Sequence, residues 1–225
     1  MTPQQFTLDL VPPPQPTLEN FVAGANGAAL AALRALRAGT GPQYVHLWGP
    51  PGSGRSHLLA AVRTSAQARH EPAPFTPHER VYAVDDVHQL DAHGQARLFQ
   101  LQNEVRQHPG TFLLTAADLP PTQLSLREDV RTRLGWGLVF GLHPIAEADQ
   151  SAALLAYARA RGARVDEDLI PYMLARLPRD MRTLVGVLDA LDTFALARQR
   201  ALTIPLLRDW QQQGLRRSGA PGGGT

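Results

Sequence analysis

The 225-residue sequence has no cysteine and no lysine, and all 22 of its basic side chains are arginines. The absence of cysteine excludes a disulfide framework and a cysteine zinc site. No apolar run approaches the length of about 18 residues that a transmembrane helix needs, and the N-terminus has no basic-then-apolar signal pattern. We therefore expect a cytoplasmic protein without a membrane partner.

Charge of either sign is also sparse, because only 19% of the residues are charged and the formal net charge is +2. Such a balance gives no reason to expect non-specific binding of nucleic acid. Hydrophobic residues make up 44% of the chain, which is typical of a globular protein. The length suits one domain of usual size and a second, smaller one.

The most informative stretch is a glycine-rich run between two apolar segments. Residues 45–48 form a short apolar strand pattern, three glycines follow within positions 49–54, and an apolar helical pattern begins at Leu58. This is the strand, loop and helix order of a phosphate-binding loop, in which backbone N–H groups and a helix N-terminus face phosphate oxygens. Ser56 lies where a hydroxyl would hold Mg²⁺.

Position 55 departs from the motif G-x-x-x-x-G-K-[ST], because an arginine stands where the motif has lysine. A lysine ammonium is a compact point charge, whereas a planar guanidinium fills the space beside the phosphates differently. The sequence therefore favours phosphate binding more than rapid hydrolysis, although Arg55 also fits the chain's arginine-only composition. An ordinary Gly/Pro turn is the alternative for the whole loop, and the spacing disfavours it.

Two adjacent acids end the next expected strand. Residues 80–87 are mostly apolar and finish at Asp85 and Asp86. An aspartate at this end of a parallel strand holds Mg²⁺ in phosphoryl-transfer sites, opposite the Ser or Thr of the phosphate loop. Asp86 then takes the place of a base that activates water, and the alternative is a pair of solvated acids.

Two further groups of polar residues are ambiguous. Asp118 follows a strand at 111–115, where it either faces the γ-phosphate or caps a turn before the next prolines. Arg127, Arg131 and Arg133 lie on one short helical stretch. They form either a solvated face or a set of cations that reaches the nucleotide of a neighbouring molecule.

Strands and helices alternate up to residue 142, and only helices follow. We expect strands at 43–48, 80–87, 111–115 and 138–142, and helices at 28–37, 56–69, 91–108 and 124–134. The later helices are expected at 146–161, 167–177, 179–199 and 204–212. The predicted fold class is α/β, with a parallel sheet flanked by helices and a small all-α domain after it.

The N-terminal residues differ from the rest of the chain. Prolines at positions 12, 13, 14 and 16 favour an extended linker. Before them, Phe6, Leu8 and Leu10 fall on one side of an extended peptide. Such a segment suits a docking peptide for a partner's groove, and a tail without binding function or an added edge strand are the alternatives.

Taken together, these features resemble the AAA+ ATPases, and more closely the family related to the replication initiator DnaA. Segment 21–26 (F-V-x-G-x-N) resembles the adenine-side segment of DnaA, 131–138 its arginine-finger segment and 180–184 its sensor-two helix. The resemblance covers about residues 17–212. It implies an AAA+ P-loop domain at 17–143 and a helical lid at 144–215, between a linker at 1–16 and a tail at 216–225.

Residues 5–10 are similar to the Q-[LF]-x-L-x-L peptide that docks on the bacterial sliding clamp, and residues 54–59 read G-R-S-H-L-L. We expect no DnaA-type helix-turn-helix domain after the lid. These features resemble the Hda family of DnaA regulators. The resemblance implies a clamp-bound protein with ADP (or ATP) and Mg²⁺ that stimulates ATP hydrolysis by DnaA and prevents re-initiation.

The implied partners are DnaA and the sliding clamp, the β subunit of DNA polymerase III. DNA would be contacted only through the clamp, which places the protein at the bacterial nucleoid, and a homo-oligomer stays open. Intrinsic turnover is expected to be weak or absent. Two alternatives remain: an active AAA+ ATPase that remodels or loads a replication partner, and an inert scaffold on the clamp that carries no ADP.

The resemblance also assigns the site residues. The implied nucleotide site comprises Val22, Gly49, Gly52, Ser53, Gly54, Arg55, Ser56, His57, Asp118 as sensor one and Arg182 as sensor two. Mg²⁺ is assigned to Ser56 and Asp85, and Asp86 is a further catalytic candidate. Arg133 is the implied arginine finger, acting on a partner's nucleotide. The implied clamp-binding residues are Gln5, Phe6, Leu8 and Leu10.

The sequence departs from the family between Ser56 and Asp85. The family normally fits a further strand and a further helix in this interval, and here it is too short for them. We therefore expect the edge strand of the sheet to be missing or very short, and contact with single-stranded DNA through that edge is not expected.

Overall fold

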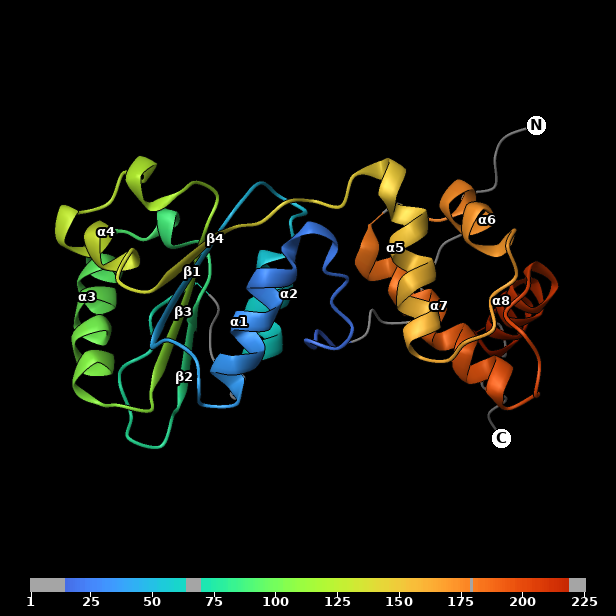
Figure 1. Cartoon of the computed structure of the whole chain (residues 1–225), viewed down its shortest axis with the longest axis horizontal. Helices are drawn as coiled ribbons and strands as arrows, with labels where there is room; N and C mark the ends of the chain where they lie inside the picture. Colours follow the sequence, from blue (N-terminus) through green and yellow to red (C-terminus); the bar gives the residue numbers. More distant parts are fainter. Residues whose placement is uncertain (1–14, 64–69, 179, 219–225) are drawn as a thin grey trace, which may run out of the picture. The chain divides into compact units, whose positions relative to one another are not determined.

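The computed structural model describes residues 15–63, 70–178 and 180–218, and Figure 1 shows their helices and strands. The predicted clamp-binding residues 5–10 lie outside these ranges. The chain divides into two compact units, one formed by Gln15–Ile145 and one that contains the residues from Ala146 onward. The first unit alternates strands and helices, and the second is helical.

A parallel sheet lies at the centre of the first unit. Its strands are β1 (Tyr44–Trp48), β2 (Val81–Val84), β3 (Phe112–Ala117) and β4 (Leu138–Gly141), in the order β2-β3-β1-β4. All residues of β3 are buried, as expected for a strand that is covered on both faces. In a parallel sheet all carboxyl ends meet at one edge, and there β1 leads into the glycine-rich loop.

Helices cover both faces of this sheet. Helices α1 (Gly27–Arg37) and α2 (Arg55–Val62) lie on one face, and α3 (Ala92–Gln107) and α4 (Glu128–Leu134) on the other (Figure 1). Because side chains alternate along a strand, Leu114 packs toward α1 and α2 while its neighbour Leu113 packs toward α3 and α4. The predicted α/β class with a parallel sheet is confirmed.

Several expected helices differ from the structure in their bounds, and the last one continues to Ser218 instead of ending at residue 212. The helix expected from residue 124 begins only at Glu128, because Leu124 and Leu126 are buried alternately from an extended backbone. Helix α2 ends at Val62 and Arg63 has an extended backbone, so the expected continuation of this helix is wrong at residue 63; residues 64–69 lie outside the described ranges.

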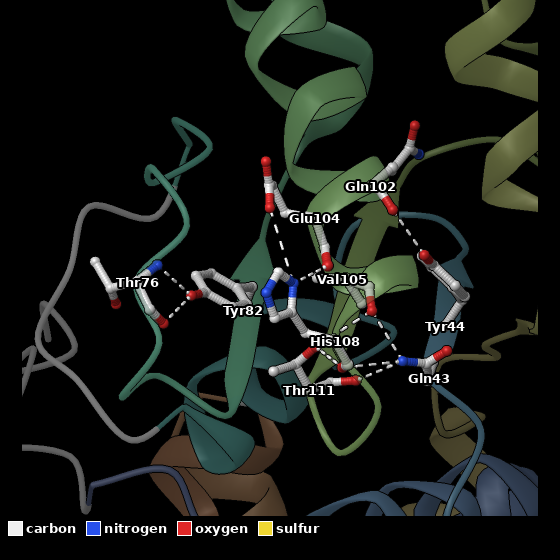
Figure 2. A network of polar contacts seen from close by, with 9 residues as sticks. All are labelled: Gln43, Tyr44, Thr76, Tyr82, Gln102, Glu104, Val105, His108 and Thr111. Carbon is white, nitrogen blue, oxygen red and sulfur yellow. Dashed lines mark hydrogen bonds and ion pairs between the residues drawn. The ribbon is translucent and has the colours of Figure 1, made fainter.

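Residues 70–80, which lead into β2, form no strand in this described segment. Tyr82 of β2 holds this segment through two hydrogen bonds. The Tyr82 hydroxyl donates to the carbonyl oxygen of Thr76 and accepts from the N–H of Thr76, both at 2.8 Å (Figure 2). Phe75 stacks on Tyr82 and on His108, with ring centroids 5.6 and 4.4 Å apart. This proline-containing segment is thus tied to the sheet by side chains instead of a strand ladder.

The second unit consists of α5 (Glu147–Ala160), α6 (Leu169–Arg176), α7 (Met181–Leu196) and α8 (Ile204–Ser218). Its core includes Leu154, Leu169 and Met173, none of which is measurably exposed. Asp180 caps α7 by accepting from the Thr183 N–H at 2.8 Å. None of the helices in the described ranges combines the length and the apolar character that a membrane span requires.

Candidate nucleotide site

The glycine-rich loop connects β1 directly to α2, as the sequence predicts. Gly54 precedes the helix with φ +94°, a conformation that side chains other than glycine rarely adopt. Gly49 lies so near the carbonyl oxygen of Leu142 that a Cβ there would run into it. The backbone can therefore turn tightly at both ends of the loop, with the N-terminus of α2 behind it.

Two observations are consistent with an anionic ligand at the loop. Ser53 is 3% exposed, and its Oγ has no hydrogen-bond partner in the described residues. A buried hydroxyl without a partner is costly, so an acceptor or donor supplied by a ligand or water would satisfy it. Ser56, by contrast, is exposed at the first turn of α2, where its hydroxyl is available to a metal-bound nucleotide.

Arg55 lies with Asp86 in a partly buried ion pair. The Nη1 atom of Arg55 is 3.7 Å from Oδ1 of Asp86, and the two side chains are 11% and 22% exposed. Asp86 has φ +48°, in the left-handed region that aspartate tolerates better than most residues. That turn after β2 directs the carboxylate to the loop arginine, and His70 approaches the other carboxylate oxygen at 3.6 Å.

Asp85 is buried, with 4% of its surface exposed, and its Oδ1 accepts from the N–H of Asp86 at 2.9 Å. Among the described residues no three His, Asp or Glu side chains gather into a group that could hold a metal. A Mg²⁺ ion here would therefore need phosphate oxygens and water beside Ser56 and Asp85, which is how Mg²⁺ is usually bound at nucleotide sites.

Asp118, the predicted sensor one, follows β3 directly. It is half-exposed, and its Oδ1 lies 3.5 Å from Nδ1 of His88. His88 belongs to the short 3₁₀ turn Val87–Gln89 that follows the acid pair. The carboxyl ends of β2 and β3 are thus linked by a side-chain contact at the edge of the sheet where β1 enters the loop.

The sequence analysis missed His46 in the middle of β1. Its side chain is 1% exposed, its Nδ1 is paired with Oγ1 of Thr115 at 2.8 Å, and its Nε2 has no partner in the described part of the chain. Burial, with the nearby charge of Arg55, lowers its pKa from 6.5 to about 4. A histidine within an otherwise apolar strand was the available signal, and it indicates a neutral imidazole beside the loop.

The predicted adenine-side segment, residues 21–26, contacts the loop through Phe21. Phe21 lies beside Gly54, and its ring centroid is 5.4 Å from that of His57. His57 in turn pairs through Nε2 with the carbonyl oxygen of Thr17 at 2.9 Å. Val22 is partly exposed next to Phe21, which leaves an apolar side chain available to an adenine ring.

The predicted arginine finger, Arg133, is on α4, which covers the opposite face of the sheet from α2 (Figure 1). It hydrogen-bonds Asn103 and stacks on Phe99 and Trp136, with Cζ 3.7 and 4.8 Å from the two ring centroids. The structure therefore does not bring Arg133 together with the loop residues. Arg182, the predicted sensor two, is exposed on α7 in the helical unit.

Both units of the chain are similar to known proteins. Residues 147–210 match the family model of the Hda lid domain. Domain III of DnaA from Thermotoga maritima matches with 19% identity and a TM-score of 0.56, over 90% of this chain and 98% of that one. AMPPCP-bound DnaA from Aquifex aeolicus matches with 19% identity and a TM-score of 0.58, over 91% of this chain and 68% of that one.

The same fold extends to a motor protein. The RuvB Holliday junction branch migration motor of Thermotoga maritima is 16% identical, with a TM-score of 0.51, over 91% of this chain and 72% of that one. At such identities the structures show a shared fold, and the family model identifies the helical unit. Both findings confirm the resemblance expected from the sequence. The chain is thus a protein with the AAA+ fold of DnaA whose helical unit is a lid domain of the Hda type.

Proposed function

We propose that this chain is a regulator of replication initiation that binds ADP, docks on the DNA sliding clamp and stimulates ATP hydrolysis by DnaA. Its action prevents a second initiation. The observation that carries the proposal is the match of residues 147–210 to the Hda lid domain, in a chain that also contains a phosphate loop of complete spacing.

The nucleotide is held by the loop between Gly49 and Ser56. Backbone N–H groups and the N-terminus of α2 face the diphosphate, and Ser53 supplies a buried hydroxyl. Mg²⁺, when bound, neutralises phosphate charge, and Ser56 and Asp85 are the side chains that would hold it. Val22 is assigned to the adenine side and Asp118 to the terminal phosphate, and Arg182 of the lid is the sensor-two candidate.

A low intrinsic turnover follows from the pairing of Arg55 with Asp86. The carboxylate at the position expected for a water-activating base is directed toward a guanidinium at 3.7 Å. A base occupied in this way is less available to orient a water. The nucleotide therefore serves to order the domain, and the chemistry takes place on the partner.

The partner contacts are assigned to two places. Arg133 would meet the nucleotide of ATP-bound DnaA, because an arginine supplied from a second molecule stabilises charge on a transferring phosphoryl group. Gln5, Phe6, Leu8 and Leu10 would dock on the clamp, which brings the protein to DNA that has just been copied.

The test combines the purified chain, clamp-loaded DNA and ATP-bound DnaA, and follows the conversion of DnaA-bound ATP to ADP. Wild type should accelerate hydrolysis, and Arg133→Ala should abolish the acceleration while it still binds ADP. Replacement of Leu8 and Leu10 by alanine should remove clamp binding and leave ADP binding intact. No acceleration by wild type, or full acceleration by Arg133→Ala, would contradict the proposal.

A second candidate is an active AAA+ ATPase, favoured by the buried Asp85 after β2 and by the fold shared with the RuvB motor. A steady-state ATPase assay without DnaA separates the two. Sustained turnover above background supports the ATPase, and its absence together with co-purified ADP supports the regulator.

A further inference from the structure

Three side chains enclose the guanidinium of Arg133, and we call them the Arg133 cage. Phe99 and Asn103 lie one turn apart on α3, and Trp136 follows the end of α4. The Arg133 Cζ is 3.7 Å from the Phe99 ring centroid and 4.8 Å from that of Trp136. Nη1 donates to Oδ1 of Asn103, so the cation is held by two rings and by one hydrogen bond.

The wall formed by Trp136 is itself supported. Tyr44 of β1 meets the Trp136 ring edge-on at a centroid distance of 5.7 Å. Arg106 of α3 approaches the same ring, with Cζ 5.1 Å from its centroid. Trp136 nevertheless remains 40% exposed, so the cage is at the surface and not in the core.

The chemistry of the cage favours one orientation of the guanidinium. A planar guanidinium stacks on the faces of aromatic rings. Its N–H groups then point outward in a plane parallel to the rings. In the described part of the chain Arg133 makes one hydrogen bond, through Nη1 to Asn103, which leaves its other N–H groups as donors for a ligand. An open hollow of about 660 Å³ adjoins the cage and is lined by Arg127, Glu128, Asp129, Thr132, Arg133 and Trp136.

A free arginine side chain must lose rotamer freedom when it engages a phosphate. The cage imposes that loss before any partner arrives, so less binding energy is needed to order the side chain at the moment of contact. A phosphate oxygen that enters the hollow would then meet donors already in place.

We propose that Phe99, Asn103 and Trp136 are positioning residues that hold Arg133 ready for the phosphates of a nucleotide bound to a second molecule. This inference rests on the proposed function, in which that second molecule is ATP-bound DnaA. The three residues act through Arg133 and do not themselves touch the nucleotide.

The first test uses the full chain alone and is independent of DnaA. In NMR spectra of arginine-labelled protein, the two rings should shift the Arg133 Nε–Hε signal away from the position of exposed arginines. Trp136→Leu should return it toward the position of exposed arginines. An Arg133 signal that already has that position in wild type would overturn the cage.

The second test measures hydrolysis by ATP-bound DnaA at increasing concentrations of the chain. We expect Trp136→Leu, Phe99→Leu and Asn103→Ala each to lower the maximal stimulation about 3- to 30-fold, the range that a lost cation–π or charged hydrogen bond allows. The half-saturating concentration should change much less. Phe99→Tyr keeps a ring and should retain stimulation, and Gln100→Ala, on the exposed side of α3, is the matched control.

The outcomes separate the two proposals. No stimulation by wild type contradicts the proposed function, and the NMR signal then decides alone whether the cage holds Arg133. Stimulation by wild type, with equal or higher maximal stimulation by all three cage variants, overturns the positioning role. ADP binding and thermal unfolding identify a misfolded variant, and Trp136→Leu at the surface keeps the test valid if Phe99→Leu does not fold.

Discussion

The side-chain amide of Asn26 holds both polar groups of the His143 backbone: its Nδ2 donates to the carbonyl oxygen at 2.8 Å, and its Oδ1 accepts from the N–H at 2.9 Å. Asn26 ends the short turn Gly24–Asn26, and His143 follows β4. Two segments far apart in the chain are thus joined at the last residues of the α/β unit.

Asn26→Ala should lower the free energy of unfolding by about 1–3 kcal/mol, because it removes two hydrogen bonds around a side chain that is 4% exposed. Asn26→Asp keeps the acceptor but loses the donor, and it should be destabilising too. Urea unfolding measures both. His143→Ala is the matched control, because only its backbone takes part, and its effect should stay within about 0.5 kcal/mol. An Asn26→Ala effect as small as this control would contradict the interpretation.

Much of the α/β unit follows from local patterns. Apolar runs at 43–48 and 111–115 predict β1 and β3, and the glycine spacing predicts the loop between β1 and α2. The expected helix start at residue 124 was wrong, because burial of Leu124 and Leu126 from an extended backbone depends on the core that they enter. The first residue of this helix is therefore set by tertiary packing and not by local helix propensity.

The polar details of the site were less predictable. Asn26 and His143 are 117 positions apart, and Arg133 and Asn103 are 30 apart, so no local pattern connects them. The pairing of Arg55 with Asp86 arises from the left-handed turn at Asp86, which the sequence does not specify. The spacing of residue types was thus enough to predict the loop, whereas the partners of the polar side chains could be identified only from the folded structure.

Gly54→Ala should destabilise the protein more than Gly52→Ala. Both glycines have positive φ, at +94° and +80°, so alanine costs about 1–2 kcal/mol of backbone strain at either position. A Cβ at position 54 would also lie 2.5 Å from Cε2 of Phe21, whereas a Cβ at position 52 meets open space. Urea unfolding without nucleotide gives the two free energies. Equal losses would show that Phe21 moves aside freely.

Arg55→Ala should weaken ADP binding about 10- to 100-fold, because a charge-assisted hydrogen bond to phosphate contributes about 1.5–3 kcal/mol. Asp86→Asn is the complementary variant: asparagine also tolerates the left-handed backbone, and it frees the guanidinium from its ion pair. It should bind ADP as tightly as wild type or more tightly. Titration calorimetry measures both affinities, and wild-type affinity in Arg55→Ala would exclude a phosphate contact for this side chain.

His46 should make the protein less stable in mild acid. Its pKa is about 4 in the folded protein and about 6.5 when the chain is unfolded, so between these values the unfolded state binds the proton and the folded state does not. Stability therefore falls as pH decreases through this window, by about 2 kcal/mol from His46 alone between about pH 7.5 and pH 5. Below about pH 4 both states are protonated, and no further loss comes from this residue.

His46→Asn tests this assignment through the slope of stability against pH, and not through the absolute stability, which also reflects packing. Asparagine can still bond Oγ1 of Thr115 but takes up no proton, so the variant should lose about 2 kcal/mol less than wild type over the same interval. If His46→Asn and wild type shared one slope, the acid sensitivity would belong to another group, and the buried imidazole beside the phosphate loop would have to accept its proton without cost.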